Sequence, residues 1–581
     1  MVRGRAKANR KVQAWGAAAA ACLMLAATAS LAQAPSPSQV TPQTLRPSDD
    51  IGGRGIVLPE SAPLDVPEGA GDLSVTITGV RFEGGFPELA EAVAALTAQA
   101  VGRPVTVAEL YALAASVEQM YAAAGYVLVR VVLPPQEIVD GGVFRLVIVD
   151  GFVEDVEVQA LSPRVRDVVA RRMASLVGKR HITLAEIERR VLLAGDVPGL
   201  RLRSTLVRGE KQGGTRLVLE GDHSVVQGSL GVNNALNRSY GRWQYTSSAA
   251  TNSMLGFGEQ IYGSYSGSDD LEGTFDGTTP LRIVGGGAVI PLGSDGLILN
   301  PEYTHSRSRP LLLDPAALAT RDVFERFAVR VSYPFVLTRA RTLKIHGAYE
   351  HIEQTSEAID FGVDLNHDRY SVLRAGLEHG QALASGGILV VSGTVSQGLE
   401  GRDAKDAAVS GVPLSRLGSD PDFRKLLAEV HYAHPLPHDV RLGLAVRGQT
   451  SFGDALFDSE QFVLDGPDLL SGFDSGTFGV DQGIAARLEL SRPFALPVAG
   501  WAKVVTPYVF GAAGRGWLME PTAVERESVK AASIGAGVRA SLDGPFGMPG
   551  GAVSFELARR FTDDPTAPDD YRASVNAAIR Y

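Results

Sequence analysis

The chain closes with the stretch YRASVNAAIRY, residues Tyr571 to Tyr581. Successive side chains of a β-strand point to opposite faces, so residues at alternate positions share a face. Here the alternate positions are apolar or aromatic, and the last of them is aromatic: Tyr571, Ala573, Val575, Ala577, Ile579 and Tyr581. The pattern predicts a final strand with one apolar face.

The same alternation recurs upstream, from His223 onward. Segments of about ten residues alternate apolar and polar positions, with clusters of Gly, Asp, Asn and Ser between them. In Phe327–Phe335, five apolar side chains share one face and Arg330 lies on the other, and Lys344 and Arg441 occupy the polar faces of two further segments. Such charges are tolerated where one face lines a water-filled lumen and the other meets lipid. A soluble β-sandwich or barrel would need an apolar interior.

We therefore expect residues 223–581 to form a transmembrane antiparallel β-barrel. At roughly 20–24 residues per strand and connection, the segment has room for about 16 strands. Outer-membrane barrels commonly end on a paired strand with a terminal aromatic residue, which the barrel-assembly machinery reads. We interpret four residues of the last strand as this assembly signal: Tyr571, Val575, Ile579 and Tyr581.

Residues 1–34 predict a secretory signal peptide. Five basic residues and no acidic one precede an Ala- and Leu-rich run that ends at the small-residue site Ala32-Gln33-Ala34. The run is too short and too rich in alanine for a membrane anchor, and a lipoprotein would need Cys22, inside the run, as its modified residue. Cleavage would remove five positive charges and take the formal net charge from -10 to -15, which disfavours nucleic acid as a partner.

Cys22 is the only cysteine, so the mature chain would have none. This excludes a disulfide scaffold, a cysteine-rich zinc site and a cysteine nucleophile. No run of eighteen apolar residues follows the leader, so any membrane crossing requires a closed barrel, with outer-membrane lipid around it.

Between leader and barrel the sequence changes character twice. Residues 35–71 hold seven prolines and little periodicity, which predicts an extended linker without a packed core. Residues 72–222 hold two copies of a β-α-α-β-β unit, 72–150 and 151–222. In each copy a Thr-x-x-Glu capping box opens the second helix, at Thr106 and at Thr183, 77 residues apart. The repeat predicts an α+β tandem ahead of the all-β region.

Two runs in the tandem carry a family resemblance. The run from Ala123 to Val156 contains Gly125-Tyr126, Leu133-Pro134-Pro135-Gln136 and Asp150-Gly151. It resembles the first POTRA domain of two-partner secretion transporters, the FhaC/ShlB/HecB (TpsB) family of the BamA-type POTRA-barrel superfamily. The run from Leu192 to Gly209, centred on Val197-Pro198-Gly199, resembles the second POTRA domain.

In that family the POTRA domains lie in the periplasm and receive an unfolded client protein. An extended polypeptide can add to the edge of a small sheet through main-chain hydrogen bonds. The resemblance therefore implies a client-binding strand, which we place at Tyr126, Val127, Leu128, Val129 and Arg130. The alternative is that the two domains only help the barrel to assemble.

The run from Leu469 to Leu490 resembles the sixth extracellular loop of the superfamily, which folds back into the lumen, and the strand after it. The loop tip is Ser471-Gly472-Phe473, where the superfamily usually has arginine first. The residues that follow fit the family pattern: Gly479, Asp481, Gly483, Arg487 and Glu489.

Downstream, Phe510 to Gly514 resembles an inner-wall strand that usually reads Phe-x-Asp-x-Gly, and Ala512 stands at the aspartate position between Phe510 and Gly514. The family's tip arginine pairs with that aspartate. Losing one partner would leave an unpaired charge in a confined lumen, and losing both avoids that cost. Two structural outcomes remain open: the loop docks through Phe473 and backbone bonds at Gly472, or it is looser. A third alternative is a change of function in this branch.

The family usually also has an N-terminal helix that plugs the pore. Here Pro42 interrupts the corresponding stretch and further prolines flank it. An interior proline costs a helix about 3 kcal/mol, so a long plug helix is not expected.

The sequence contains no GxSxG, HExxH or P-loop motif, and we expect no enzyme activity, cofactor or metal. The resemblance implies an outer-membrane pore of type Vb secretion, which recognises a secreted client and moves it to the cell surface. Its other partner would be the barrel-assembly machinery, during biogenesis.

Three alternatives remain. An insertase of the same superfamily usually carries more than two POTRA copies. A passive porin does not need the periplasmic tandem. An outer-membrane enzyme should carry a catalytic triad or a metal set.

Overall fold

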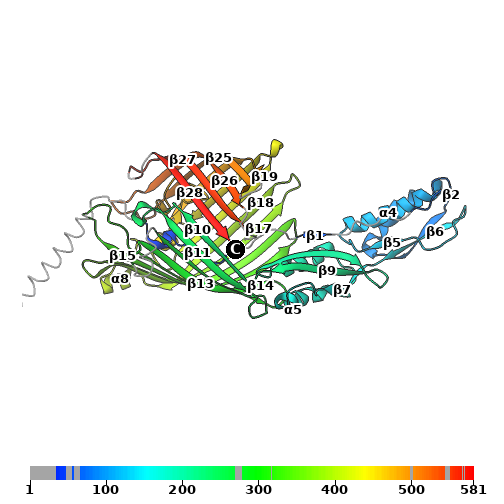
Figure 1. Ribbon diagram of the computed structural model, residues 1–581, viewed down its shortest axis with the longest axis horizontal. Helices are drawn as coiled ribbons and strands as arrows, with labels where there is room; N and C mark the ends of the chain where they lie inside the picture. Colours follow the sequence, from blue (N-terminus) through cyan, green and yellow to red (C-terminus); the bar gives the residue numbers. More distant parts are fainter. Residues whose placement is uncertain are drawn as a thin grey trace, which may run out of the picture.

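The computed structural model describes residues 35–47, 55–57, 66–268, 278–315, 317–496, 502–542, 550–565, 567 and 570–581. The predicted signal peptide lies outside the described residues. A large barrel occupies one end of the molecule, and two α+β units follow one another away from the barrel's opening (Figure 1). Among the described residues, no helix is both long and apolar enough to cross a membrane.

The barrel is a closed sheet of 16 antiparallel strands in chain order, as predicted. β23 and β24 both pair with β25, so they count as one strand that is interrupted after Ser491. The sheet closes where β10 pairs with β28, from Ser229 opposite Arg580 to Asn233 opposite Asn576. The strands are β10 (Val226–Asn233), β11 (Gln244–Asn252), β12 (Gln260–Ser268), β13 (Leu281–Leu292), β14 (Leu297–Ser308), β15 (Thr320–Leu337), β16 (Arg341–Ala358), β17 (Val363–Ala382), β18 (Ile388–Gly401), β19 (Arg424–Pro435), β20 (Arg441–Thr450), β23 (Gln482–Ser491) with β24 (Phe494–Ala495), β25 (Ala502–Trp517), β26 (Ser528–Leu542), β27 (Gly551–Thr562) and β28 (Tyr571–Arg580).

The two faces of the barrel strands differ as the alternation predicts. On β15, the apolar side chains of Phe327, Val331 and Phe335 are exposed on the outside. Arg326 of the same strand is buried on the inside. An apolar exterior around a polar interior is the arrangement of a membrane barrel with an aqueous lumen.

The first α+β unit packs two helices against a three-stranded sheet of order β3-β6-β5. The predicted capping box is present, since Thr106 N–H donates to Glu109 Oε2 (2.7 Å) and Glu109 N–H donates to Thr106 Oγ1 (3.1 Å). The elements are β2 (Ser74–Thr76), β3 (Gly79–Gly84), the short 3₁₀ helix η1 (Pro87–Leu89), α3 (Ala90–Ala98), β4 (Pro104–Thr106), α4 (Val107–Ala123), β5 (Arg130–Val132) and β6 (Val143–Val149).

The second unit repeats this plan around a four-stranded sheet of order β1-β8-β9-β7. Its capping box at Thr183 and Glu186 is also present. The elements are β7 (Phe152–Glu157), α5 (Pro163–Met173), η2 (Ala174–Leu176), α6 (Leu184–Gly195), β8 (Leu200–Arg208) and β9 (Gly214–His223). The fourth strand, β1 (Gly55–Val57), comes from the predicted linker and pairs in parallel with β8.

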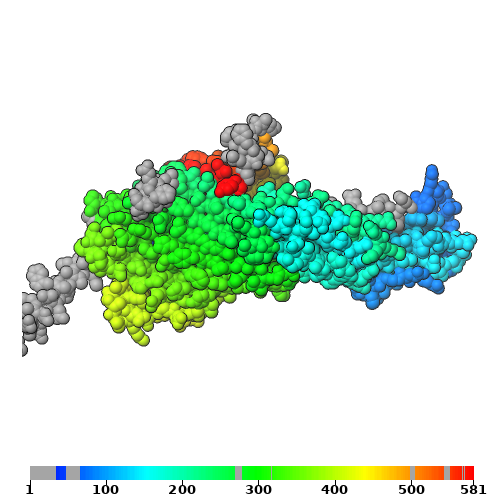
Figure 2. All heavy atoms as spheres, turned by 60° about the horizontal axis from the view of Figure 1, so that its bottom comes forward, coloured from blue at the N-terminus to red at the C-terminus, as the bar shows by residue number. Residues whose placement is uncertain are grey.

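The two units and the barrel contact one another in sequence (Figure 2). Between the units, the ring of Phe86 stacks on His181 with centroids 4.1 Å apart. At the barrel, Arg189 Nη1 donates to the carbonyl of Pro334 (2.7 Å), and Arg190 forms an ion pair with Asp295 (3.1 Å). Arg189 and Arg190 lie on α6, so this helix joins the second unit to the barrel.

The expectation of an unpacked linker is wrong for residues 35–47, which lie inside the barrel and line its cavity. Pro35, Pro37 and Thr41 are buried there. The segment has no core of its own, and the barrel interior supplies the packing that the linker sequence lacks. Its only helix is the single turn α2 (Pro37–Val40), followed by Pro42, in line with the expectation that prolines prevent a long plug helix.

Candidate functional site

A cavity of about 1340 Å³ lies inside the barrel. Its walls combine mostly polar side chains of the barrel strands with two segments that fold into it. These are residues 35–47, called the N-terminal segment below, and residues 451–481 between β20 and β23, called the lumen loop. Any polypeptide that crosses the barrel must pass these two segments.

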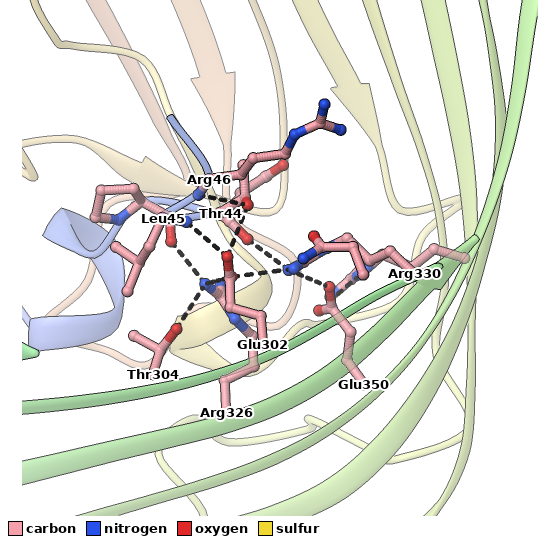
Figure 3. A network of polar contacts seen from close by, with 12 residues as sticks. Thr44, Leu45, Arg46, Glu302, Thr304, Arg326, Arg330 and Glu350 are labelled. Atoms are coloured by element: carbon pink, nitrogen blue, oxygen red, sulfur yellow. Dashed lines mark hydrogen bonds and ion pairs between the residues drawn. The ribbon is translucent and has the colours of Figure 1, made fainter. Parts of the chain in front are cut away.

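The N-terminal segment is held by charged side chains of the wall (Figure 3). Glu302 of β14 accepts hydrogen bonds from the Thr44 hydroxyl and from the Leu45 N–H, both at 2.9 Å. Arg326 and Arg330 of β15 donate to the carbonyls of residues 42 and 43, both at 2.7 Å. These contacts fix residues 42–45 of the segment against β14 and β15.

The first residues of the segment contact the loops at the barrel end opposite the α+β units. The Tyr240 hydroxyl donates to the carbonyl of Pro35, and Gln39 Nε2 donates to Gln461 Oε1 of the lumen loop (3.0 Å). The segment is therefore tied to the barrel wall and to the lumen loop at once.

A chain of ion pairs runs along the wall from the N-terminal segment to the lumen loop. Arg330 pairs with Glu302 (3.0 Å) and with Glu350 (3.1 Å). Arg374 then pairs with Glu350 (3.1 Å) and with Glu460 of the lumen loop (2.6 Å). Each charge has a partner of opposite sign within a buried region, which is the condition for tolerating charges out of water.

The chain of ion pairs ends at Glu460, which also contacts β19 and β20. Lys425 Nζ lies 2.7 Å from a Glu460 carboxylate oxygen and donates to the Glu460 carbonyl (2.8 Å). Gln449 Nε2 donates to the same carbonyl (3.1 Å). The start of the lumen loop is thus bound to β17, β19 and β20.

The rest of the lumen loop docks on the adjoining wall, formed by β23, β25, β26 and β27. Two short strands, β21 (Phe462–Val463) and β22 (Gly479–Val480), pair at its base. Phe473 of the tip is buried and makes an edge-to-face contact with Phe478, with centroids 5.0 Å apart. Asp465 accepts from the N–H groups of Gly476 and Phe478, both at 2.8 Å, and burial raises the pKa of its carboxyl to about 7.

The tip is fixed by a wall ion pair that sequence reasoning did not find. Arg487 of β23 pairs with Glu556 of β27 (2.8 Å), and the Ser471 hydroxyl lies between them. Arg487 Nη1 donates to Ser471 Oγ (2.6 Å), and that hydroxyl donates to Glu556. The Tyr508 hydroxyl also donates to Glu556 (2.9 Å).

Of the open alternatives for the loop, docking is therefore the observed one. Phe473 contributes as expected, and the backbone at Gly472 takes part through its carbonyl, to which Arg560 donates at 3.4 Å. The main polar contact is instead the Ser471 hydroxyl. Glu556 sits at an inward position of the penultimate strand, and its charge in an otherwise alternating segment was the one available signal for it.

The loop-to-strand residues contact different parts of the barrel interior. Asp481 forms a buried ion pair with Arg416, whose Nη1 donates to both carboxylate oxygens at 2.7 Å, and accepts from the N–H of Met519 (2.7 Å). Glu489 pairs with Arg539 at 2.5 Å. Gly479 lies against Gln39 of the N-terminal segment, and Gly483 against Phe462 and Leu464. Only Arg487 joins the tip contact directly.

The predicted inner-wall motif lies beneath the tip. The Arg487 guanidinium stacks 3.7 Å from the centroid of the Phe510 ring. Ala512 is buried in the same apolar cluster as Phe473, and Gly514 leaves room for Leu470. The motif keeps its place in the fold without its aspartate, because the wall charge comes from β27.

This geometry agrees with the comparisons to known proteins. The profile described as "Haemolysin secretion/activation protein ShlB/FhaC/HecB" matches residues 213–540, more than half of the chain. The chain belongs to this family. A second profile, "POTRA domain, ShlB-type", matches residues 75–151.

Several individual proteins are similar to parts or most of the chain. The heme/hemopexin transporter protein HuxB of Haemophilus influenzae strain 86-028NP is 28% identical over 163 residues, which is 28% of this chain and 29% of HuxB. The outer membrane transporter CdiB of Dickeya dadantii is 23% identical over 411 residues, 70% of either chain. The structure of CdiB from Escherichia coli superposes with a TM-score of 0.67 at 18% identity, over 94% of this chain and 95% of that one. CdiB from Acinetobacter baumannii gives 0.59 at 16% identity, over 94% of either chain.

The family places the barrel in the outer membrane and the two α+β units, its POTRA domains, in the periplasm. The barrel end that contacts α6 is then periplasmic, and the loops around Pro35 are extracellular. The lumen loop is the extracellular connection from β20 to β23, folded inward.

The structure does not bring Tyr126 to Arg130 together as an open edge strand. Tyr126 donates to Glu88 (2.8 Å), and Arg130 pairs with Glu118 (3.3 Å). Leu128 is buried in the core of the second POTRA domain, and Val129 in that of the first, with Val127 packed beside Leu128. In this conformation these side chains join the two domains rather than form a docking strand.

The predicted assembly signal lies on β28. Its outward side chains are exposed at Tyr571 and Ile579, and Val575 shares their face. Tyr581, directly after β28, exchanges two backbone hydrogen bonds with Gly228 of β10, the first barrel strand, at 2.9 and 3.0 Å. Within the described residues, no cluster of three or more His, Cys, Asp or Glu side chains is arranged to hold a metal ion.

Proposed function

We propose that this chain is the outer-membrane transporter of a two-partner secretion system. It binds an unfolded secreted client with its POTRA domains and passes the client through the barrel lumen to the cell surface. The observation that carries the proposal is the lumen itself, a polar cavity in which one extended segment of polypeptide already lies. No covalent bond is made or broken in this process.

Two features support a lumen that opens. A 16-stranded barrel is wide enough for an aqueous channel once segments inside it move. The N-terminal segment is held mainly by hydrogen bonds to charged wall groups, and water can replace such bonds as the segment leaves. A dry apolar core would resist the same displacement far more strongly.

For client docking, the outer edge of β3 is the best candidate in the POTRA pair. On the other edge of that sheet, the outward N–H of Val131 in β5 already donates to Glu118 (3.0 Å). In the second domain, β1 covers β8, and a bridge to Val177 borders β7 at Val153. Among the described residues no strand borders β3 on its outer side, so an extended client segment can add there.

The test of transport is the protein content of the culture medium. Deleting the gene should remove one large exported protein from the medium and leave the other outer-membrane proteins at normal levels. A general loss of outer-membrane proteins would instead indicate an assembly insertase. An unchanged medium would contradict the transport proposal.

Two further measurements test docking. A chain without residues 72–222 should still conduct ions in planar bilayers but should no longer export the client. A photo-reactive side chain at Arg81 of β3 should form an adduct with the client, whereas one at exposed Arg171 on α5 should not. Equal adducts at both positions would rule out β3 as the docking edge.

A further inference from the structure

Three charged wall residues bind the N-terminal segment mainly through its main chain and not through its side chains. Arg326 donates to the carbonyl of Pro42 and Arg330 to that of Gln43, both at 2.7 Å. Glu302 accepts from the N–H of Leu45 at 2.9 Å. Among the contacts described for residues 42–45, one side-chain hydrogen bond reaches these wall residues, from the Thr44 hydroxyl to Glu302. Such contacts are available from almost any extended polypeptide.

The wall residues are held in position without the segment. The Arg330 guanidinium is fixed between Glu302 (3.0 Å) and Glu350 (3.1 Å). Glu302 also accepts from the Tyr262 hydroxyl (2.7 Å) and lies 3.8 Å from Arg326. The site is therefore preorganised, and hydrogen bonds from or to charged groups are stronger than neutral ones.

An apolar pocket adjoins the charged residues. Leu45 packs against the cluster of Ala250, Tyr262 and Val289. Gly285 leaves the space that Leu45 fills, because a Cβ at position 285 would lie 2.6 Å from Leu45 Cδ1. The pocket accepts one aliphatic side chain beside the bound main chain.

We propose that Glu302, Arg326, Arg330 and this pocket form a peptide-binding subsite for the client in transit. The ligand is an extended stretch of polypeptide with an aliphatic residue, held by its main chain. Residues 42–45 of the N-terminal segment occupy the subsite as an internal ligand when no client is present. The inference rests on the proposed transport function and assigns a place in the pore to its substrate.

The physical reason is that a pore must bind many different stretches of client in turn while the client passes through. The client's sequence at any level of the lumen changes continuously, whereas its main chain presents the same donors and acceptors throughout. A site that binds main-chain groups can hold each stretch briefly and release it. Such binding would also displace the N-terminal segment, because both use the same three side chains.

The test compares two backgrounds, the full chain and a chain without residues 35–47, using the client identified by the deletion experiment. In the truncated background, Glu302→Gln and Arg330→Lys should slow client export at least five-fold in a pulse-chase measurement. The matched controls are Glu357→Gln and Arg321→Lys, which alter another ion pair (3.0 Å) on β15 and β16. If the wall residues serve only to anchor the N-terminal segment, neither substitution will slow export once that segment is absent, and the proposal is overturned.

A binding measurement covers the case in which a variant assembles poorly. A fluorescent peptide of residues 39–47, QVTPQTLRP, should bind the detergent-solubilised truncated chain by fluorescence anisotropy. Arg330→Lys should weaken its binding at least ten-fold, and Arg321→Lys should not. A scrambled peptide that keeps the leucine should bind within about three-fold of the original, and equal binding to all variants would refute the subsite.

The two proposals fail differently. If the wild-type chain exports no protein, the transport function fails, whatever the peptide does. If the wild type exports its client and the truncated Glu302→Gln and Arg330→Lys chains export it equally fast, transport stands and the subsite is refuted.

Discussion

Among single residues, the tip of the lumen loop carries the clearest departure from the superfamily pattern. The expected arginine and aspartate are replaced by Ser471 and Ala512, yet the loop is docked. In this chain the ion pair lies within the wall, between Arg487 and Glu556. It contacts the loop tip through the hydroxyl of Ser471. Hydrogen bonds to charged groups contribute about 1.5–3 kcal/mol each. One serine can therefore hold the tip without carrying a charge into the lumen.

Ser471→Ala should make docking of the loop tip less favourable by about 2 kcal/mol, because Arg487 and Glu556 both lose their hydrogen bond to the tip. Hydrogen exchange of residues 462–480 in the detergent-solubilised barrel should accelerate accordingly. Ser475→Ala is the matched control, since at that position the backbone N–H makes the contact, to the carbonyl of Ala235 (2.9 Å). Equal exchange in both variants would show that the hydroxyl does not hold the tip.

Docking of the loop should also depend on pH through Asp465. Burial raises the pKa of its carboxyl to about 7, so the docked loop favours the protonated form. The stabilisation is fully present below about pH 4, where the carboxyl of the undocked loop is protonated as well, and it is lost progressively as pH rises from there through 7. After correction for intrinsic exchange, residues 462–480 should exchange faster at pH 8 than at pH 6. In Asp465→Asn the difference should disappear, and its persistence would assign it to another group.

Among strands and loops, the chain of ion pairs links elements far apart in sequence. It connects β14, β15, β16 and β17 and ends on Glu460 of the lumen loop. Because Arg330 binds both the N-terminal segment and this chain, movement of the segment alters the surroundings of Glu350 directly. The two segments inside the barrel thus share one set of wall charges.

The last strand carries a prediction of its own. Tyr581→Ala should keep the two backbone hydrogen bonds to Gly228 but lose the terminal aromatic ring. The sequence predicts this ring to be part of the assembly signal, so we expect assembly into the outer membrane to slow several-fold. Heat-modifiable gel migration after pulse labelling measures the rate, and Phe335→Ala, which removes an exposed aromatic ring from β15, serves as control. A rate equal to that of the wild type would remove Tyr581 from the signal.

For the whole molecule, the barrel is filled by its own chain. The N-terminal segment and the lumen loop both line the 1340 Å³ cavity, and they touch through Gln39 and Gln461. Below the barrel, α6 fixes the second POTRA domain to the periplasmic turns. The POTRA pair and the pore are therefore joined by a short, ordered connection.

Removing residues 35–47 should raise single-channel conductance in planar bilayers, because it empties part of the lumen. The lumen loop remains docked on the opposite wall, so the increase should be smaller than that of a chain that also lacks residues 462–478. A truncated chain with wild-type conductance would show that the segment does not obstruct the ion path.

Much of this architecture is predictable from local patterns. The alternation around Phe327 indicates which side of each strand meets lipid, because strand geometry turns every second side chain the same way. The capping boxes at Thr106 and Thr183 indicate the helix starts, because both bonding partners lie within four residues. In the same way, Pro42 excludes a long plug helix.

The lumen contacts are of another kind. Ser471 meets Glu556 across 85 residues of sequence, and Thr44 meets Glu302 across 258. The same holds for Leu128, whose place in a strand-like run suggested an exposed edge, whereas the packing of two domains buries it. Alternation and capping depend on residues that are close together along the chain, so they can be predicted from the sequence. Closure of the barrel brings distant residues together in a confined space, and which of them pair there depends on the position of every strand between them.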